Sequence, residues 1–234
     1  MTDSVSYEFA DSVATITLDD GKVNVLGPAM QAAINGALDR AEADKTKAVV
    51  LAGNSRVFSG GFDLSVFQSG DAAAALGMLS GGFELSLRTL TFPAPVIIAA
   101  TGPAIAMGSF LLLSGDHRIG QPKSRCQAIE VAIGMTIPIS ALEIMRARLT
   151  PAAFERAAAL ATTFAGADAV AAGWLDEIVD ADQVLPRAQQ VAAEVAATLH
   201  TGAHLATKLK ARKGAIEAIQ AGIDGLAEEF TLGT

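Results

Sequence analysis

The chain has 234 residues and a formal net charge of −8, and 51% of its residues are apolar. This length and apolar content are enough to bury a full hydrophobic core, which excludes an intrinsically disordered protein. The acidic balance argues against nucleic acid as the main partner, because that role requires a basic surface.

The N-terminal residues and the cysteine content both indicate the cytoplasm. The sequence MTDSVSYEF lacks the basic start and the apolar run of a signal peptide. Cys126 is the one cysteine, so the chain can form no intramolecular disulfide and offers no metal-binding cysteine pair. We therefore expect a protein of a reducing, cytoplasmic compartment.

The first fifty residues carry strand and helix patterns in turn. Residues 5–18 alternate apolar and polar positions twice, which predicts a β-hairpin. Pro28 suits the first turn of a helix. The apolar stripe of that helix is formed by Met30, Ile34, Leu38 and Ala41. The run KAVVLAG, Lys47–Gly53, is typical of a strand that is buried on both faces.

An uncharged stretch, Thr89–Gly115, is long enough to span a membrane. Pro93 and the break Thr101-Gly102-Pro103 divide it, so we interpret it as a buried strand, a turn and a buried helix. Ala-rich helical patterns dominate after residue 150. Strands interleaved with helices indicate an α/β fold with βαβ crossovers.

Two glycine-marked turns each follow a buried strand and open an apolar segment. The first is FSGGFDL, residues 58–64, and the second lies within VIIAATGPAIAMGSFLLL, residues 96–113. A helix that opens there leaves backbone N–H groups unpaired, and glycine lets a ligand approach closely because it has no Cβ. Gly60 and Gly61 alone would favour a simple tight turn. Two such turns that converge would form an oxyanion hole.

These turns and two later segments resemble the crotonase superfamily of enoyl-CoA hydratases and isomerases. FSGGFDL is similar to that family's F-x-A-G-x-D-L stretch, and VIIAATGPAIAMGSFLLLSGD is similar to its strand, Gly-rich turn and helix ending in Asp. AIEVAIGMTIP resembles its P-E-x-x-x-G-x-x-P segment, and ADAVAAGWLDEIVD resembles its A-x-x-x-G-L-V-D-x-V segment. The order and spacing of four segments are far more specific than any one motif.

The resemblance implies a crotonase-like α/β fold, a ββα spiral over residues 1–180, with a C-terminal helical trimerisation region over residues 181–234. It implies a homotrimer or a dimer of trimers that binds an acyl-CoA thioester in fatty acid metabolism. Coenzyme A is then part of the substrate. We expect no separate cofactor, no metal, no nucleic acid and no membrane partner.

Carried over residue by residue, the family's two oxyanion amides fall on Phe62 and Met107. Their backbone N–H groups would hold the thioester oxygen as it becomes enolate-like. The resemblance places further substrate contacts in the two turns, at Gly60, Gly61, Phe62, Asp63, Leu64, Met107, Gly108 and Phe110. Met107 stands at a position that is usually glycine, and we expect its bulk to narrow the pocket. Thr101 replaces the usual asparagine of the second turn.

The family's hydratases use two glutamates, and this chain keeps one of them. The first position holds Phe110, and the second holds Glu130 in an apolar neighbourhood. A single base beside a stabilised enolate can move a proton from C2 to C4, which shifts a 3-enoyl thioester to the 2-enoyl form. The resemblance therefore implies a Δ3,Δ2-enoyl-CoA isomerase with Glu130 as the proton shuttle.

Three alternatives remain open at this point. Glu130 could be a surface residue at the end of a strand or helix, as most glutamates are. The enzyme could be a hydratase that uses Glu130 with unusual help. A site too altered for chemistry could still bind an acyl-CoA without turnover.

Other functional motifs find little support. The sequence contains no G-x-S-x-G, no P-loop and no G-x-G-x-x-G. His117, His200 and His204 form no zinc set, and we interpret the first as structural and the other two as a solvated helix surface. The basic segment 201–213 predicts either a solvated helix face or a contact to the phosphates of coenzyme A near a subunit boundary. Its cations are Lys208, Lys210, Arg212 and Lys213.

Overall fold

A computed structural model of the chain describes residues 4–232. Its main sheet has six strands in the order β1-β2-β3-β4-β6-β9. β1 pairs antiparallel with β2, and every other neighbouring pair in this sheet is parallel. The strands are β1 (Val5–Ala10), β2 (Val13–Leu18), β3 (Ala48–Ala52), β4 (Val96–Ala100), β6 (His117–Gly120) and β9 (Glu177–Ile178).

The elements expected in the first fifty residues are confirmed. β1 and β2 form the hairpin, with Val5 opposite Leu18. α1 (Pro28–Ala43) begins at the predicted proline, and all four residues of its apolar stripe are buried. β3 is buried at every position, as expected for a parallel strand that is covered on both faces.

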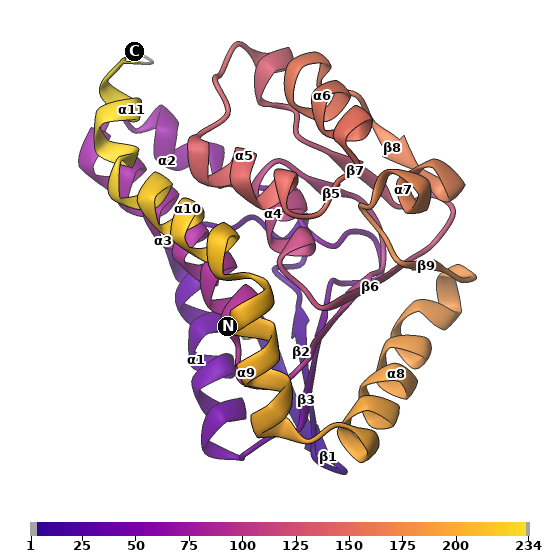
Figure 1. The fold of residues 1–234 in the computed structure, drawn as a ribbon. Coiled ribbons are helices and arrows are strands. Elements are labelled where there is room, and N and C mark those ends of the chain that lie inside the picture. Colours follow the sequence, from indigo (N-terminus) through magenta and orange to yellow (C-terminus); the bar gives the residue numbers. More distant parts are fainter. Residues whose placement is uncertain (1–3, 233–234) are drawn as a thin grey trace.

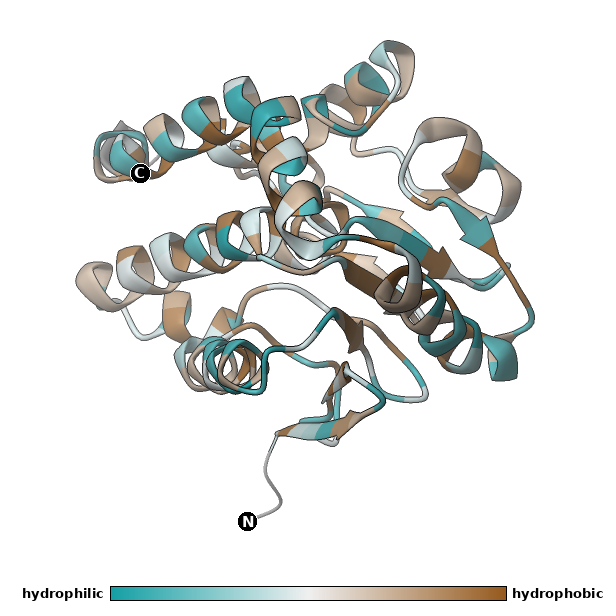
Figure 2. Cartoon of the chain, turned by 60° about the horizontal axis from the view of Figure 1, so that its bottom comes forward, coloured by the Kyte–Doolittle hydropathy of each residue, from teal (hydrophilic) through white to brown (hydrophobic). Residues whose placement is uncertain are grey.

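Helices cover both faces of the main sheet (Figure 1). α8 (Val184–Thr198) packs on one face, where Val50 and Ala52 of β3 contribute to a small apolar core. Val49 and Leu51 point to the opposite face and join the larger core, which includes α1 and α3 (Ala72–Thr91). This alternation follows from the two-residue period of a strand. In Figure 2 the helices carry hydrophilic residues mainly on their outward faces.

A second, three-stranded sheet lies between the main sheet and the candidate active site described below. Its strands are β5 (Ala104–Ile105), β7 (Arg125–Gln127) and β8 (Phe164–Ala165). β5 leads into the buried helix α4 (Met107–Leu113). The stretch Thr89–Gly115 therefore forms β4, a turn with β5, and α4, which confirms its interpretation as strand, turn and helix. Among residues 4–232, no helix is long and apolar enough to cross a bilayer.

The last three helices fold back on the body of the chain (Figure 1). α9 (Thr201–Ala211) and α10 (Lys213–Asp224) contact α3, and α10 also packs on α5 (Ile139–Arg146). Apolar residues of α10 and α11 (Leu226–Leu232) join the larger core. The other helices are α2 (Leu64–Gln68), α6 (Pro151–Leu160), α7 (Gly166–Ala172) and the 3-10 turns Glu130–Ile133 and Ala181–Gln183. The division of the chain at residue 180 stays a prediction.

Asp116, which follows α4, binds two cations of α9 and its C-cap. Lys208 is buried, and its Nζ donates to Asp116 Oδ2 at 2.7 Å and to the carbonyl of Phe92 at 3.1 Å. Arg212 Nη2 donates to Asp116 Oδ1, also at 2.7 Å. Asp116 Oδ2 also accepts from the N–H of Val96 at 2.7 Å. This cluster fastens α9 to the start of β4.

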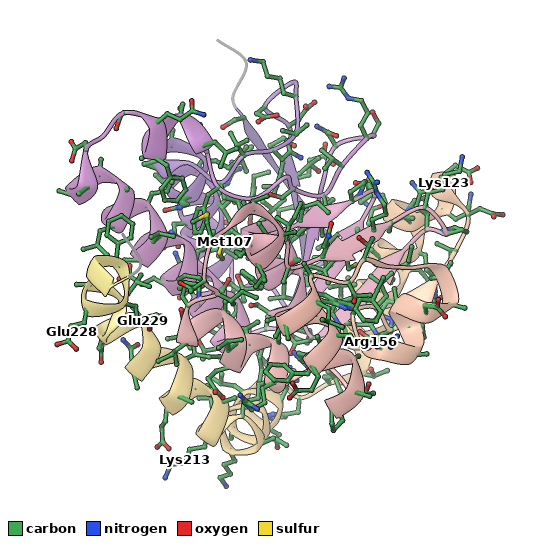
Figure 3. All side chains as sticks on the ribbon, turned by 90° about the horizontal axis from the view of Figure 1, so that it is seen from above. Met107, Lys123, Arg156, Lys213, Glu228 and Glu229 are labelled. Atoms are coloured by element: carbon green, nitrogen blue, oxygen red, sulfur yellow. The ribbon has the colours of Figure 1, made fainter. Side chains whose placement is uncertain are left out.

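The expectation of a phosphate contact along residues 201–213 is therefore wrong for two of its four cations. Lys208 and Arg212 are committed to Asp116, and a solvated helix face does not describe them either. Lys210 and Lys213 are exposed. In Figure 3 Lys213 lies at the rim of the molecule, far in the view from the centrally placed Met107. These ion pairs of Asp116 could not be predicted from sequence patterns, because Asp116 lies far from α9 along the chain.

We predict that Asp116→Asn lowers the free energy of unfolding by about 3 kcal/mol, because it leaves the buried Lys208 cation without its counter-charge. Urea unfolding of the purified protein measures the change. Glu217→Gln is the matched control, since it removes the exposed ion pair between Glu217 Oε1 and Lys213 Nζ, which lie 3.7 Å apart. That control should cost less than about 1 kcal/mol. Equal effects of the two substitutions would contradict the anchoring role of Asp116.

Candidate active site

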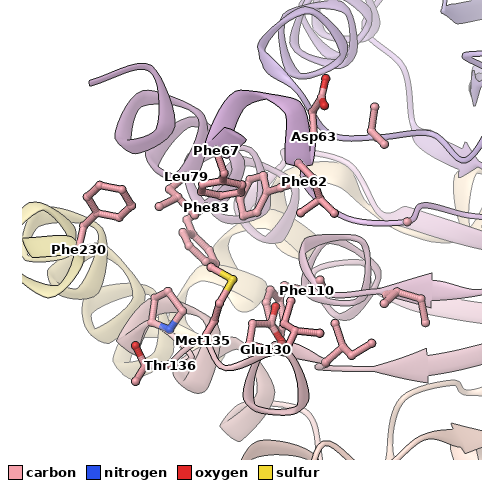
Figure 4. Close-up of a pocket in the computed structure, with 18 of the residues that line it drawn as sticks. Phe62, Asp63, Phe67, Leu79, Phe83, Phe110, Glu130, Met135, Thr136 and Phe230 are labelled. Atoms are coloured by element: carbon pink, nitrogen blue, oxygen red, sulfur yellow. The ribbon is translucent and has the colours of Figure 1, made fainter. Parts of the chain in front are cut away.

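A cavity of about 620 Å³ opens between α2, α3, the segment after Glu130 and α11 (Figure 4). Apolar side chains dominate its walls, with phenylalanines from four parts of the chain. The predicted site residues that line it are Gly60, Phe62, Asp63, Leu64, Phe110 and Glu130. Gly61, Met107 and Gly108 are not among the lining residues, although their chain neighbours Gly60, Phe62 and Ala106 are. The fold therefore brings both glycine-marked turns and the candidate base to one place.

Gly61 shapes the first turn. It has a φ of +97°, in the left-handed region that glycine adopts without strain. Its N–H donates to Ser59 Oγ at 3.2 Å, and its carbonyl accepts from Leu26 N at 2.7 Å. The next amide, Phe62 N–H, has no hydrogen-bond acceptor within residues 4–232. This amide therefore stays available to a ligand.

Ala106 shapes the second turn in the same way. Its φ of 49° and ψ of −127° lie in a region that residues with a Cβ rarely adopt. Its N–H donates to Gln127 O at 2.9 Å, and its carbonyl accepts from Ser109 Oγ at 2.7 Å, so both ends of the residue are held. The next amide, Met107 N–H, also lacks an acceptor in the described part of the chain.

The two turns are in direct contact. A Cβ built on Gly61 would lie 2.9 Å from Ile105 O, 2.9 Å from the Cβ of Ala106 and 3.5 Å from Met107 N. Only glycine permits this close approach of the two backbones, and this explains why position 61 is a glycine. Two free amides on touching backbones are the arrangement expected of an oxyanion hole.

Glu130 supplies a buried carboxyl group at the cavity wall. It is the first residue of a 3-10 helix and is 8% exposed, so its interpretation as a surface residue is wrong. Oε2 has no hydrogen-bond partner among the described residues. Burial in apolar surroundings raises the pKa of Glu130 to about 7, because desolvation penalises the carboxylate. The group can therefore accept or donate a proton near neutral pH.

Met107 does not narrow the cavity, contrary to the expectation. Its side chain is fully buried and lies behind the lining, beside Gly82 of α3. A Cβ on Gly82 would lie 2.6 Å from the ring of Phe62 and 3.3 Å from Met107 Sδ. The glycine in α3 makes the room that the larger side chain at position 107 needs.

Phe110 occupies the position of the missing acid. Its ring is 1% exposed and packs against Phe83, with the ring centroids 6.2 Å apart. Phe83 in turn meets Phe62 edge to face at 6.2 Å. An aromatic wall thus stands where the hydratases of the family carry their first glutamate. Water bound at this wall would find no hydrogen-bonding partner on the Phe110 side chain.

Asp63 lines the cavity and also caps α2. Its Oδ1 accepts from Ser65 N at 3.0 Å and from Ser65 Oγ at 2.7 Å. An aspartate at this N-cap satisfies a backbone N–H that the helix cannot pair. Asp63 therefore holds the start of α2 beside the first glycine-marked turn.

Sequence reasoning missed the contribution of α11. Leu226, Glu229 and Phe230 line the cavity together with Glu130. Glu229 Oε2 accepts from Ile139 N at 3.1 Å, while its Oε1 is buried without a partner in the described chain. Helical periodicity gave no signal for this role, because it cannot tell which distant surface a helix will cover.

The histidines are structural, with one correction. His117 Nε2 lies 3.6 Å from Glu177 Oε2, and His200 caps α9 by accepting from Ala203 N at 3.3 Å. His204 is only partly solvated: it is half-buried, and this burial lowers its pKa. Within residues 4–232, no group of three or more His, Cys, Asp and Glu side chains could hold a metal ion.

Comparison with known sequences gives one family. The sequence profile of the enoyl-CoA hydratase/isomerase family matches residues 8–228. A putative enoyl-CoA hydratase of Thermus thermophilus is 30% identical over 202 residues, which cover 84% of this chain and 79% of that protein. The mouse mitochondrial enoyl-CoA delta isomerase 1 is 29% identical over 191 residues, which cover 80% of this chain and 66% of that protein.

Solved structures are still more similar. A protein of Mycobacterium tuberculosis that is described as an enoyl-CoA isomerase superposes with a TM-score of 0.95 at 55% identity, over 98% of this chain and 100% of that chain. A second structure of the same protein, described as a probable enoyl-CoA hydratase, superposes with a TM-score of 0.97 at 56% identity, over 98% and 97% of the two chains. An enoyl-CoA hydratase of Mycobacterium marinum superposes with a TM-score of 0.94 at 56% identity, over 97% and 99% of the two chains. The names of these proteins divide between the two activities. By sequence and by fold, the chain belongs to the enoyl-CoA hydratase/isomerase family of the crotonase superfamily.

Proposed function

We propose that this enzyme shifts the double bond of a 3-enoyl-CoA to the 2-enoyl position. One observation carries the proposal: the buried Glu130 carboxyl, one oxygen of which has no hydrogen-bond partner among the described residues, lines a cavity in which Phe110 stands at the other acid position of the family pattern. A single base and two free amides are sufficient for a proton transfer between carbons. They are not sufficient for the usual two-acid addition of water.

The Glu130 carboxylate takes a proton from C2 of the 3-enoyl thioester. The electron pair of that C–H bond delocalises into a dienolate, whose charge lies largely on the thioester oxygen. The N–H groups of Phe62 and Met107 hold this oxygen. Protonated Glu130 then donates the same proton to C4, and the double bond settles between C2 and C3. No atom is gained or lost, and Glu130 returns to its starting state.

A second candidate, hydration of a 2-enoyl-CoA, is favoured by the position of Glu229. Its Oε1 is buried without a partner in the described chain, and the residue lines the same cavity. A second carboxylate could orient a water molecule even though the family's usual position holds Phe110. In that case Glu229→Gln would stop hydration.

The assay that separates the candidates follows the absorbance of the conjugated thioester. Purified enzyme is mixed with a trans-3-enoyl-CoA and, separately, with a trans-2-enoyl-CoA. A rise with the first and no fall with the second supports the isomerase. A fall with the second supports the hydratase. No change with either substrate, with binding still seen by calorimetry, would overturn both reactions in favour of an acyl-CoA-binding protein.

We predict that Glu130→Gln lowers kcat for isomerisation by about 10³-fold, because an amide cannot act as a general base. The affinity for hexanoyl-CoA, measured by calorimetry, should change little, since the amide has the same size. Glu155→Gln, at an exposed position of α6, is the control and should leave turnover unchanged. Loss of binding together with turnover would mean that Glu130 maintains the fold of the site instead.

The raised pKa of Glu130, about 7, also predicts a pH profile. Isomerisation needs the carboxylate, so kcat/KM should fall about tenfold for each pH unit below the pKa. A profile that stays flat down to about pH 5 would contradict Glu130 as the base.

The same shift predicts a pH dependence of stability. The folded state binds this proton more tightly than the unfolded chain, whose glutamate has the ordinary pKa of 4.5. The free energy of unfolding should therefore decrease as the pH rises from about 4.5 to about 7. Urea unfolding of Glu130→Gln should lack this part of the decrease, and an unchanged pH dependence in the variant would contradict the buried titration.

A further inference from the structure

We propose that Ser59 is a positioning residue that fixes the orientation of the two amides of the oxyanion hole, because it is hydrogen-bonded to both turns that carry these free N–H groups. The inference rests on the proposed function of the site, the polarisation of a thioester carbonyl. Ser59 is fully buried and does not line the cavity, so it cannot touch the substrate itself. Its action must pass through the two turns.

The side chain of Ser59 holds the first turn. Its hydroxyl donates to Asn24 O at 2.7 Å and accepts from Gly61 N at 3.2 Å. The bond to Gly61 N fixes the peptide on one side of Gly61, and the bond from Leu26 N fixes the carbonyl on the other. The direction of the Phe62 amide follows from these two restraints.

The backbone of Ser59 holds the second turn. Its carbonyl accepts from Ile105 N at 3.0 Å, and its N–H donates to Pro103 O at 3.2 Å. A Cβ on Gly108 would lie 2.5 Å from Ser59 O, so the start of α4 also rests on this residue. One buried serine thus contacts the segments before and after the Met107 amide.

Asn24 gives the serine a rigid support. It is fully buried with a φ of 52°, and its Nδ2 donates to Leu18 O at 3.0 Å and to Phe58 O at 3.1 Å. Its Oδ1 accepts from Asp20 N at 3.1 Å. A chain of hydrogen bonds therefore runs from the end of β2 through Asn24 and Ser59 to the oxyanion turn.

Ser59→Ala should remove the bond to Gly61 N and allow the first turn to relax. Oxyanion donors stabilise charge only when they are aimed at the developing oxyanion, and loss of one donor costs about 10²–10³ in kcat. A donor that is displaced rather than lost should cost less, so we expect kcat to fall by about 10- to 100-fold. KM should change far less, because the cavity walls are untouched.

Ser124→Ala is the matched control. Ser124 is also fully buried, and its hydroxyl makes the same pair of bonds, donating to Ala100 O at 2.8 Å and accepting from Gln121 N at 3.1 Å. Ser124 does not line the cavity and contacts neither oxyanion turn through these bonds. Both substitutions therefore remove an equivalent buried hydroxyl, and only one of them disturbs the proposed positioning.

The test uses the infrared carbonyl band of hexanoyl-CoA labelled with ¹³C at the thioester carbon. This saturated thioester can be neither isomerised nor hydrated, so the band reports polarisation alone. Wild-type enzyme should shift the bound band to lower frequency. Ser124→Ala should retain that shift, and Ser59→Ala should lose most of it while still binding the probe.

The possible failures are distinct. A wild-type enzyme that binds the probe with no shift would overturn the proposed function of the site. A wild-type shift that persists in Ser59→Ala would overturn the positioning role alone. Equal loss of the shift in both serine variants would also overturn it, because general destabilisation would then explain the effect. Ser59→Cys, which keeps a weaker donor and acceptor, should give an intermediate shift.

Discussion

The site depends on the steric contact between two peptide backbones. Residue 61 lies against residues 105–107 so closely that no Cβ would fit. Each of the two turns contains a residue of positive φ, Gly61 in one and Ala106 in the other, and each of these directs the following N–H out of the regular bonding pattern. The hydrogen bonds from Ile105 N to Ser59 O and from Leu26 N to Gly61 O, together with the buried start of α4, hold this contact. Displacing either backbone would separate the two amides.

The proposed proton transfer also requires a carboxyl group whose charged form is not stabilised by its surroundings. Acids below the protein surface are usually paired with a cation, as the partly buried Asp116 is with Lys208 and Arg212. Glu130 has no such partner, and desolvation raises its pKa to about 7. The two acids lie in opposite electrostatic surroundings. Asp116 joins distant elements through hydrogen-bonded ion pairs. The ionised form of Glu130 is destabilised by desolvation, so its carboxylate is basic enough to accept a proton near neutral pH.

The sequence was most informative where the determinants are local. The hairpin, α1, β3 and the two glycine-marked turns depend on neighbouring residues, and so their positions could be predicted. The fates of Lys208, Arg212 and Glu229 depend on partners far along the chain, and no periodicity encodes those partners. The room for Met107 also comes from a distance, through Gly82 of α3. Long-range packing thus decided each expectation that needed correction.

The composition of the cavity wall has a further chemical consequence. An oxyanion hole that polarises a thioester carbonyl activates it toward acyl transfer as well as toward enolisation. Among the described residues that line the cavity there is no lysine, cysteine or histidine. The thiol of Cys126 is buried elsewhere, and burial raises its pKa to about 12, so it carries no thiolate. An acyl thioester held in this cavity would therefore meet no amine or thiolate of the lining that could capture its acyl group.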